Sequence, residues 1–399
     1  MHIPRTQDPS FQMQVLVTSP IPSHPQNHGN RARVYSLCRT LQKRGYKIHF
    51  VYGGFEGLTA DQETAMRNAW EHVYVVPHDP GARKQSHRKH HMIDDWYVPQ
   101  VSDITNRILK IWKIDVCLAN YVWFSRWLED VPTGIPKYLD THDMFANRDL
   151  SLKKAGIDGR WYSTTPAEEA KAFKRADTVL AIQDSEAEKF RKATKQPVLT
   201  LGHYLPAQFL AQKPLTKGQK LKVGYLASSN PINQHSLHHF NIALKANPQL
   251  QEMLSFHLAG AICASDTARD TLFEKLGFVE SVTSFYEEMD VVLNPNLGGT
   301  GLKIKSVEAL SFGKPLVATA DAMVGIASAE PFHQCKNMTA LTKALMALAR
   351  EPELLTALQD SGQAAFARYA SAQRETLDRL FPKQNTEAMK AEPPKEEAS

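Results

Sequence analysis

Short apolar runs alternate with segments of helical spacing along most of the chain. Residues 13–18 form a β-rich run, residues 31–43 carry apolar side chains at helical spacing, and residues 47–52 form a second β-rich run. Arg44-Gly45 closes the middle segment with a signal typical of a helix C-terminus. A strand, a helix and a strand in close succession predict a βαβ unit and therefore a parallel sheet.

The alternation continues in the first half of the chain and then restarts. Further strands are predicted at 73–76, 114–118, 136–140 and 177–182, and again at 221–226, 256–260, 291–293 and 315–318. Between the two series, residues 205–220 are loop-like. We therefore predict an α/β fold with two Rossmann-like doubly wound domains, over residues 1–205 and 206–360. The polar tail, residues 383–399, is predicted to be disordered.

Composition and charge narrow the function classes. The 399 residues are 42% hydrophobic and 22% charged, which is ordinary for globular domains. Lys and Arg exceed Asp and Glu by 47 − 42 = 5, too small an excess to indicate a nucleic-acid partner. The four cysteines show no disulfide or zinc spacing, and no apolar h-region or membrane span is apparent. We expect a soluble cytoplasmic protein.

The most informative segment is glycine-rich and lies between a predicted strand and a predicted helix. Gly298, Gly299 and Gly301 permit positive φ after the strand that ends at Leu293, and a helix is predicted to start at Leu302 or Lys303. In open α/β sheets, this position beyond the carboxyl end of a strand binds ligands.

Lys303 and Lys305 fall in the first turn of that helix, where cations oppose the helix dipole. A phosphate or diphosphate resting on the helix N-terminus would explain them. Alternatively both lysines point to solvent, or Lys305 pairs with Glu308. Glu308 lies on an otherwise apolar helix face, and its carboxylate could accept hydrogen bonds from ribose hydroxyls. The alternative for Glu308 is an ordinary surface position.

Residues 299–319, beginning Gly299-Thr300-Gly301-Leu302-Lys303 and including Glu308 and Gly313-Lys314-Pro315, resemble the donor-site signature of retaining glycosyltransferases with the GT-B fold, specifically glycosyltransferase family 4 (glycosyl transferases group 1). The resemblance implies an N-terminal acceptor domain and a C-terminal nucleotide-sugar domain that face each other across a cleft. It also implies that a helix at 361–382 crosses back to the N-terminal domain.

The same resemblance implies roles for single residues. His142 would lie near the donor sugar and, with Lys305, take part in catalysis. Gly29 and Asn30 would close over the donor diphosphate. The other implied donor-binding residues are Gly299, Thr300, Gly301, Leu302, Lys303, Lys305 and Glu308.

The chain departs from the family pattern at two places. Thr300 stands where the family commonly has Glu, which leaves the donor sugar open. Ser228 to Asn233 stand where the family has an Arg/Lys pair, so Lys303 and Lys305 are expected to supply the positive charge. Thr300 keeps open a non-catalytic sugar-nucleotide-binding partner, and the architecture also suits a nucleotide-sugar epimerase.

Outside this segment, a basic run at residues 83–91 is either solvated or contacts an anionic acceptor or anionic lipid headgroups. Its cations are Arg83, Lys84, Arg88 and Lys89. Asp140 and His142 face one side of a strand end, but no Asp-x-Asp pair accompanies them, so no metal and no cofactor are expected. All six tryptophans lie in the first 161 residues, where packing in the core or stacking on a sugar or base are the alternatives.

Taken with the resemblance, these features predict a hexosyltransferase. It would move a sugar from a nucleoside-diphosphate sugar to a glycan, lipid-linked or protein acceptor, with retention of anomeric configuration. We expect it to act in surface polysaccharide or glycoconjugate biosynthesis, in the cytoplasm or at the inner face of the plasma membrane.

Overall fold

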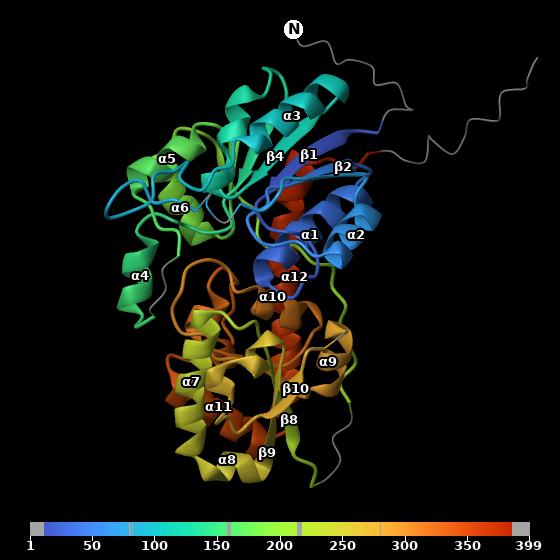
Figure 1. Cartoon of the computed structure of the whole chain (residues 1–399). Coiled ribbons are helices and arrows are strands. Elements are labelled where there is room, and N and C mark those ends of the chain that lie inside the picture. The colour runs from blue at the N-terminus through green and yellow to red at the C-terminus, as the bar shows by residue number, and fades with distance from the viewer. Residues whose placement is uncertain are drawn as a thin grey trace, which may run out of the picture.

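A computed structural model of the chain describes residues 12–79, 81, 83–157, 161–213, 218–279 and 281–384. Most of the tail for which disorder is predicted, residues 385–399, lies outside the described residues. The described chain forms two α/β domains placed end to end (Figure 1). The predicted fold class is confirmed.

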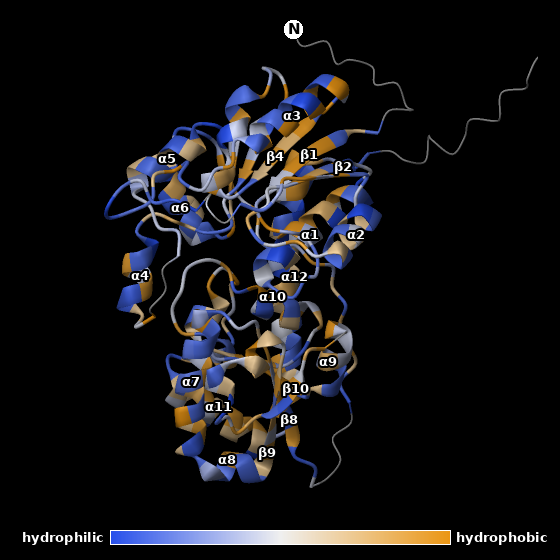
Figure 2. Ribbon diagram, in the orientation of Figure 1, coloured by the Kyte–Doolittle hydropathy of each residue, from blue (hydrophilic) through white to orange (hydrophobic). Residues whose placement is uncertain are grey.

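The N-terminal domain contains a seven-stranded parallel sheet with the order β3-β2-β1-β4-β5-β6-β7. Its central strands are apolar runs because both of their faces are buried under helices, and Figure 2 shows β1 and β4 as largely hydrophobic ribbons. The strands are β1 (Gln14–Ser19), β2 (Lys47–Tyr52), β3 (His72–Val75), β4 (Val116–Asn120), β5 (Lys137–Asp140), β6 (Thr178–Ala181) and β7 (Val198–Thr200).

The helices of this domain begin with the signals expected for helix N-termini. Thr59 forms a capping box with Gln62 at α2, and Thr165 caps α5 ahead of Pro166. The helices are α1 (Gly29–Lys43), α2 (Ala60–Ala69), α3 (Gln100–Ile111), α4 (Arg148–Lys154), α5 (Pro166–Phe173) and α6 (Asp184–Ala193), with 3-10 turns at Val122–Phe124 and Arg126–Asp130.

The C-terminal domain repeats the architecture with five parallel strands in the order β10-β9-β8-β11-β12. The strands are β8 (Leu221–Leu226), β9 (Leu254–Ala259), β10 (Glu274–Gly277), β11 (Val291–Asn294) and β12 (Leu316–Ala318). The helices are α7 (Pro231–Lys245), α8 (Pro248–Met253), α9 (Val282–Glu288), α10 (Ile304–Ser311), α11 (Met338–Arg350) and α12 (Leu354–Leu380). The 3-10 turns are Ala261–Ala264, Asp266–Ala268, Ala320–Met323 and Pro331–His333.

Helix α12 joins the two domains. Its Leu355 packs in the core of the C-terminal domain, and its Leu377 packs in the core of the N-terminal domain (Figure 1). The helix begins at Leu354, so the predicted boundary between residues 360 and 361 is wrong, because it falls inside a continuous helix. Gly362 lies within the helix, where an added Cβ would be 3.1 Å from the Leu310 side chain of α10. None of the described helices has both the length and the apolar character that a membrane span requires.

Candidate active site

The carboxyl ends of both sheets face one cavity of about 420 Å³ between the domains. Its lining comes from α1 and the β4 and β5 ends on one side, and from α7, α10 and the glycine-rich loop on the other. A cavity of this size, at the carboxyl ends of parallel strands, suits a small-molecule ligand.

The glycine-rich loop after β11 adopts the conformation that the sequence predicts. Gly298, Gly299 and Gly301 have φ of 66°, 81° and 74°, in the left-handed region that favours glycine. Helix α10 begins at Ile304, slightly later than predicted, and Lys303 is its N-cap residue. No side chain caps this N-terminus, which lies at the cavity.

Both lysines line the cavity and are half-buried, so the alternative in which they point to solvent is wrong. The Lys303 ammonium donates to the carbonyls of Thr300 and Gly301 at 3.0 and 2.8 Å, and Lys305 donates to the Asn233 side chain at 2.5 Å. Burial and the neighbouring Lys303 together lower the pKa of Lys305 to about 7. An arriving anion would reverse this effect on the pKa.

Glu308 also lines the cavity, one helical turn beyond Lys305. Its Oε2 accepts a hydrogen bond from the Tyr286 hydroxyl of α9 at 3.0 Å, so its partner is Tyr286 and not Lys305. Burial raises the pKa of Glu308 to about 7, while Tyr286 and Lys305 oppose the rise. Sequence reasoning missed Tyr286, since nothing in its neighbourhood marks it as a partner of α10.

His142 follows β5 with φ of 62° and lies on the opposite side of the cavity. Its Nε2 is 2.8 Å from the Asn120 side-chain oxygen, and its ring stacks on Tyr121 with centroids 4.1 Å apart. Burial lowers the pKa of His142 to about 4, so the imidazole is neutral near pH 7. The Asn30 side chain donates to the Tyr121 hydroxyl at 3.1 Å, which ties α1 to this cluster.

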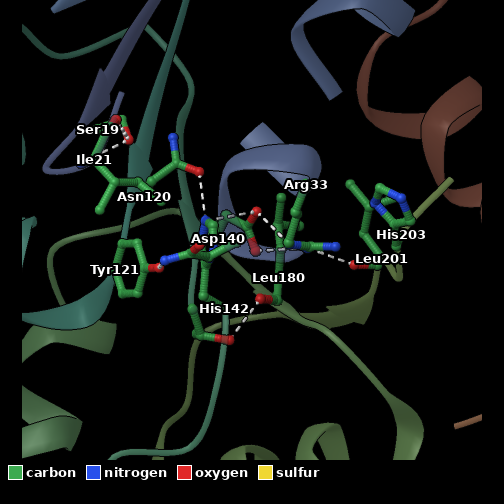
Figure 3. Close-up of polar contacts among 12 residues, drawn as sticks. Ser19, Ile21, Arg33, Asn120, Tyr121, Asp140, His142, Leu180, Leu201 and His203 are labelled. Atoms are coloured by element: carbon green, nitrogen blue, oxygen red, sulfur yellow. Dashed lines mark hydrogen bonds and ion pairs between the residues drawn. The ribbon is translucent and has the colours of Figure 1, made fainter. Parts of the chain in front are cut away.

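Behind His142, a buried ion pair fixes α1 to the sheet. Arg33 donates to both carboxylate oxygens of Asp140, at 2.9 and 2.7 Å, and to the Leu201 carbonyl at 2.7 Å. Figure 3 shows Arg33 extending from α1 to Asp140 beside the Asn120–His142 contact. Sequence reasoning missed Arg33, because nothing in the sequence of α1 distinguishes it from the other cations of that helix.

Direct hydrogen bonds join the two domains beside the glycine-rich loop. The Thr300 hydroxyl donates to Asp143 at 2.9 Å, and the Gly301 amide donates to Glu186 at 3.0 Å. Arg148 donates to the same Asp143 oxygen at 3.0 Å. Burial and the neighbouring Asp143 together raise the pKa of Glu186 to about 7. Neither Asp143 nor Glu186 was among the candidate residues.

Most of the predicted donor-site residues therefore meet at one cavity. Its lining includes Gly29, Asn30, His142, Thr300, Gly301, Leu302, Lys303, Lys305 and Glu308. Gly299 is not part of the lining. It lies at a turn of the loop that passes close to Ile232, since a Cβ added to Gly299 would be 2.9 Å from the Ile232 side chain. Phe278, which is 67% exposed, adds an aromatic ring at the C-terminal side that sequence reasoning missed.

The four cations of the basic segment are not part of the cavity lining, but Arg83 packs on Phe55, which does line the cavity. Arg83, Lys84, Arg88 and Lys89 are exposed and absent from its lining. The Arg83 guanidinium lies 4.0 Å from the centre of the Phe55 ring and donates to the Phe55 carbonyl at 2.6 Å. Among the described residues, no group of three or more His, Cys, Asp or Glu side chains is arranged to hold a metal ion.

Residues 222–351 match the family model of glycosyl transferases group 1. The matched residues lie within the C-terminal domain. No curated protein sequence matches the chain significantly.

Solved structures resemble the whole chain. A sucrose-phosphate synthase from Thermosynechococcus elongatus has a TM-score of 0.65 at 12% identity, covering 93% of this chain and 99% of its own. Anabaena HepE in complex with UDP and glucose has a TM-score of 0.61 at 12% identity, covering 92% and 99%. The pneumococcal O-GlcNAc transferase GtfA in complex with UDP and GlcNAc has a TM-score of 0.58 at 10% identity, covering 93% and 99%.

At these identities the likeness concerns the fold, which is GT-B. The group 1 domain and this fold together support the prediction of a glycosyltransferase.

Proposed function

We propose that the protein transfers a sugar from a nucleoside-diphosphate sugar to an acceptor hydroxyl with retention of anomeric configuration. The observation that carries the proposal is the meeting of two helix N-termini at one cavity. A Cβ on Gly29, the first residue of α1, would lie 3.5 Å from the Ile304 side chain, the first residue of α10. Two positive helix ends together with Lys303 and Lys305 favour a ligand with two phosphates.

Each part of such a donor would find suitable groups in the lining of the cavity. The diphosphate would rest on the start of α10, and the ribose hydroxyls would donate to Glu308, whose carboxylate Tyr286 orients. The base would lie toward Phe278, and the sugar toward His142 and Thr300. Two of the three structures named above contain UDP, so a uridine diphosphate sugar is the first donor to test.

The chemistry follows from where charge develops. When the bond between the anomeric carbon and the diphosphate oxygen breaks, the electron pair stays on the diphosphate. The lysines and the open N-terminus of α10 would stabilise that charge without reorganising. The acceptor hydroxyl oxygen would form the new bond to the anomeric carbon, and its proton would pass to the departing diphosphate oxygen. Neutral His142, held by Asn120 and Tyr121, would orient a sugar hydroxyl.

The remaining parts of the proposal concern location and pathway. The exposed cations Arg83, Lys84, Arg88 and Lys89 support contact with an anionic lipid surface or the anionic part of a lipid-linked acceptor. This would place the enzyme at the inner face of the plasma membrane, in surface polysaccharide or glycoconjugate synthesis.

A thermal-shift panel of UDP, GDP, ADP and CMP tests the donor site. A ligand at 100 times its Kd adds about 2.7 kcal/mol to the stability of the domain that binds it. We expect one nucleoside diphosphate to stabilise the wild type and Glu252→Gln, an exposed control on α8, but to stabilise Glu308→Gln much less. A shift that Glu308→Gln leaves unchanged would contradict the ribose role.

Turnover of the corresponding nucleotide sugar then separates the activities. A glycosyltransferase releases the nucleoside diphosphate faster when an acceptor is present. An epimerase converts the donor sugar with no acceptor, and a non-catalytic partner binds the nucleotide but releases nothing.

A further inference from the structure

Three histidines lie close together on α7, and none of them belongs to the lining of the cavity. The rings of His235 and His239 are 4.5 Å apart between centroids, at an interplanar angle of 65°. Residues four apart project from the same face of a helix, so the spacing in the sequence explains why these two imidazoles are neighbours. The third ring, that of His238, lies farther away, at 5.5 Å from His239.

The helix that carries the pair is fixed by contacts of its own. Asn230 caps its N-terminus by accepting from the Asn233 amide at 2.8 Å, and the Ser236 hydroxyl accepts from the Leu297 amide of the loop before α10 at 3.0 Å. Leu237, between the two histidines, is fully buried in the core of the C-terminal domain. Two side chains on such a rigid helix keep their spacing without a ligand, as a preformed site requires.

Both imidazoles of the pair are half-buried and have no polar partner in the described part of the chain. No described group forms a hydrogen bond or an ion pair with the ring of His235 or of His239. Burial lowers the pKa of His235, and the nearby His239 and His238 act in the same direction. The ring of His235 is therefore neutral near pH 7, which is the form of imidazole that binds metal ions.

Two neutral imidazoles select the class of ion. Imidazole suits the later divalent ions of the first transition row, such as Ni²⁺, Cu²⁺ and Zn²⁺, whereas Mg²⁺ and Ca²⁺ require oxygen ligands. A spacing of four residues on one helix face is also the spacing by which paired histidines hold zinc in metalloproteases. Among the described residues no third His, Cys, Asp or Glu is placed to complete a protein cage, so water would fill the other coordination positions. Such an open site exchanges its ion, unlike a closed structural zinc site.

The pair also lies where the two domains approach each other. A Cβ added to Gly156, which follows α4 in the N-terminal domain, would be 3.7 Å from the Cε1 atom of His235 (Figure 1). Two residues before His235, Asn233 lines the cavity and accepts a hydrogen bond from Lys305. An ion on the pair would therefore lie beside a contact between the domains, close to the cavity but outside it.

We propose that His235 and His239 form an exchangeable binding site for a divalent transition-metal ion at the edge of the contact between the domains. The site is separate from sugar transfer, because neither ligand lines the cavity and the ion takes no part in the reaction. Its effect would be on the approach of the two domains, since the ion and its water ligands would occupy the space beside Gly156.

Isothermal titration calorimetry with NiCl₂, MnCl₂ and MgCl₂ measures the affinity and the selectivity of the site. We expect Ni²⁺ to bind more tightly than Mn²⁺, and Mg²⁺ not to bind. His235→Ala and His239→Ala should each weaken Ni²⁺ about tenfold or more, because one of two protein ligands is lost. His238→Ala is the matched control, since His238 is an exposed histidine of the same helix, and it should leave the affinity unchanged. The three variants should melt at the same temperature as the wild type without metal, which shows that each is folded.

Modification of histidines by diethyl pyrocarbonate, mapped by peptide mass spectrometry, locates the ion. At one equivalent of Ni²⁺ we expect His235 and His239 to be protected. His87 and His90 provide an internal comparison, because their rings are 4.0 Å apart but lie on a loop, and the Nδ1 atom of His87 already accepts from the Lys89 amide at 3.3 Å. These two histidines should react as they do without metal.

Other results would overturn the inference. Protection of His87 and His90 ahead of the α7 pair would place the ion elsewhere. Unchanged affinity in His235→Ala, or a loss in His238→Ala equal to that in His239→Ala, would show that the pair is not the site. If the wild type binds no Ni²⁺, the two rings are solvated side chains and nothing more. The thermal shift with UDP is measured separately, so failure of the metal site leaves the proposed function standing.

Discussion

The ion pair of Arg33 and Asp140 allows a sharp test of what fixes α1 to the sheet beside the cavity. Asp140 ends β5 and Arg33 lies on α1, so the pair fixes the helix whose N-terminus reaches the cavity (Figure 3). We expect Asp140→Asn to remove the carboxylate charge while keeping the shape of the side chain. The Arg33 guanidinium would then be left charged with only the Leu201 carbonyl as a full partner.

The size of the effect follows from burial. Arg33 is 2% exposed and Asp140 is fully buried, so water cannot replace the lost carboxylate charge. Breaking a buried ion pair by removing one partner costs about 3–5 kcal/mol. For a domain of about 200 residues, each kcal/mol lowers the Tm by about 2–4 °C, which predicts a fall of about 6–20 °C.

Urea denaturation followed by circular dichroism measures the loss of unfolding free energy. The double variant Arg33→Met/Asp140→Leu removes both charges and should recover much of the stability, because the cost comes from the unpaired charge. Asp266→Asn breaks the exposed pair with Arg269 and should change nothing measurable. The reasoning would be refuted if Asp140→Asn cost less than about 1 kcal/mol, or if the double variant were no more stable than either single variant.

Three further predictions concern the donor side. UDP affinity measured by calorimetry should peak near pH 7. Above the Lys305 pKa of about 7, affinity falls because Lys305 is neutral in the free protein and must take up a proton to bind the diphosphate. Below the Glu308 pKa of about 7, affinity falls because Glu308 is protonated in the free protein and must lose that proton to accept ribose hydroxyls. Lys305→Met should abolish the alkaline fall and Glu308→Gln the acid fall; a flat profile in the wild type would contradict both assignments. Tyr286→Phe should weaken UDP about tenfold in the same assay through the loss of one hydrogen bond to a charged group, and unchanged affinity would mean that Tyr286 does not orient Glu308. Gly301→Ala should cost about 1–2 kcal/mol in urea denaturation, because φ is 74° and the new Cβ lies 3.4 Å from Asp143; no loss would show that the loop relaxes.

The local features of the fold and site could be predicted from the sequence. The βα alternation marks buried parallel strands, and the run from Gly298 to Glu308 marks a strand end, a turn and a helix start within a few residues. Each of these signals is carried by neighbours in the chain. Positive φ at three glycines and the gathering of Lys303, Lys305 and Glu308 at one cavity follow from that short segment.

The features that sequence missed depend on distant segments. Strand β10 is an edge strand whose first two residues, Glu274 and Lys275, are exposed, so it lacks the apolar run of a central strand. Strand β7 has only three residues. Tyr286 and Asp143 reach the site across 22 and 157 residues of sequence, and no local pattern distinguishes them from structural residues. Helix α12 continues through Gly362, where the absence of a side chain permits close packing on α10.

The hydrogen bonds between the domains show that the geometry of the site depends on both domains. The amide of Gly301 and the hydroxyl of Thr300 both belong to the loop that precedes α10, and both donate to carboxylates of the N-terminal domain. The loop is rich in glycine and has few conformational preferences of its own, so these distant acceptors help to select its conformation. Apolar packing along α12 holds the domains together, and at the cleft Ile182 packs in a core cluster with Leu302 beside the polar bonds. The geometry of the start of α10, and with it the affinity for a diphosphate, is therefore set by residues of both domains.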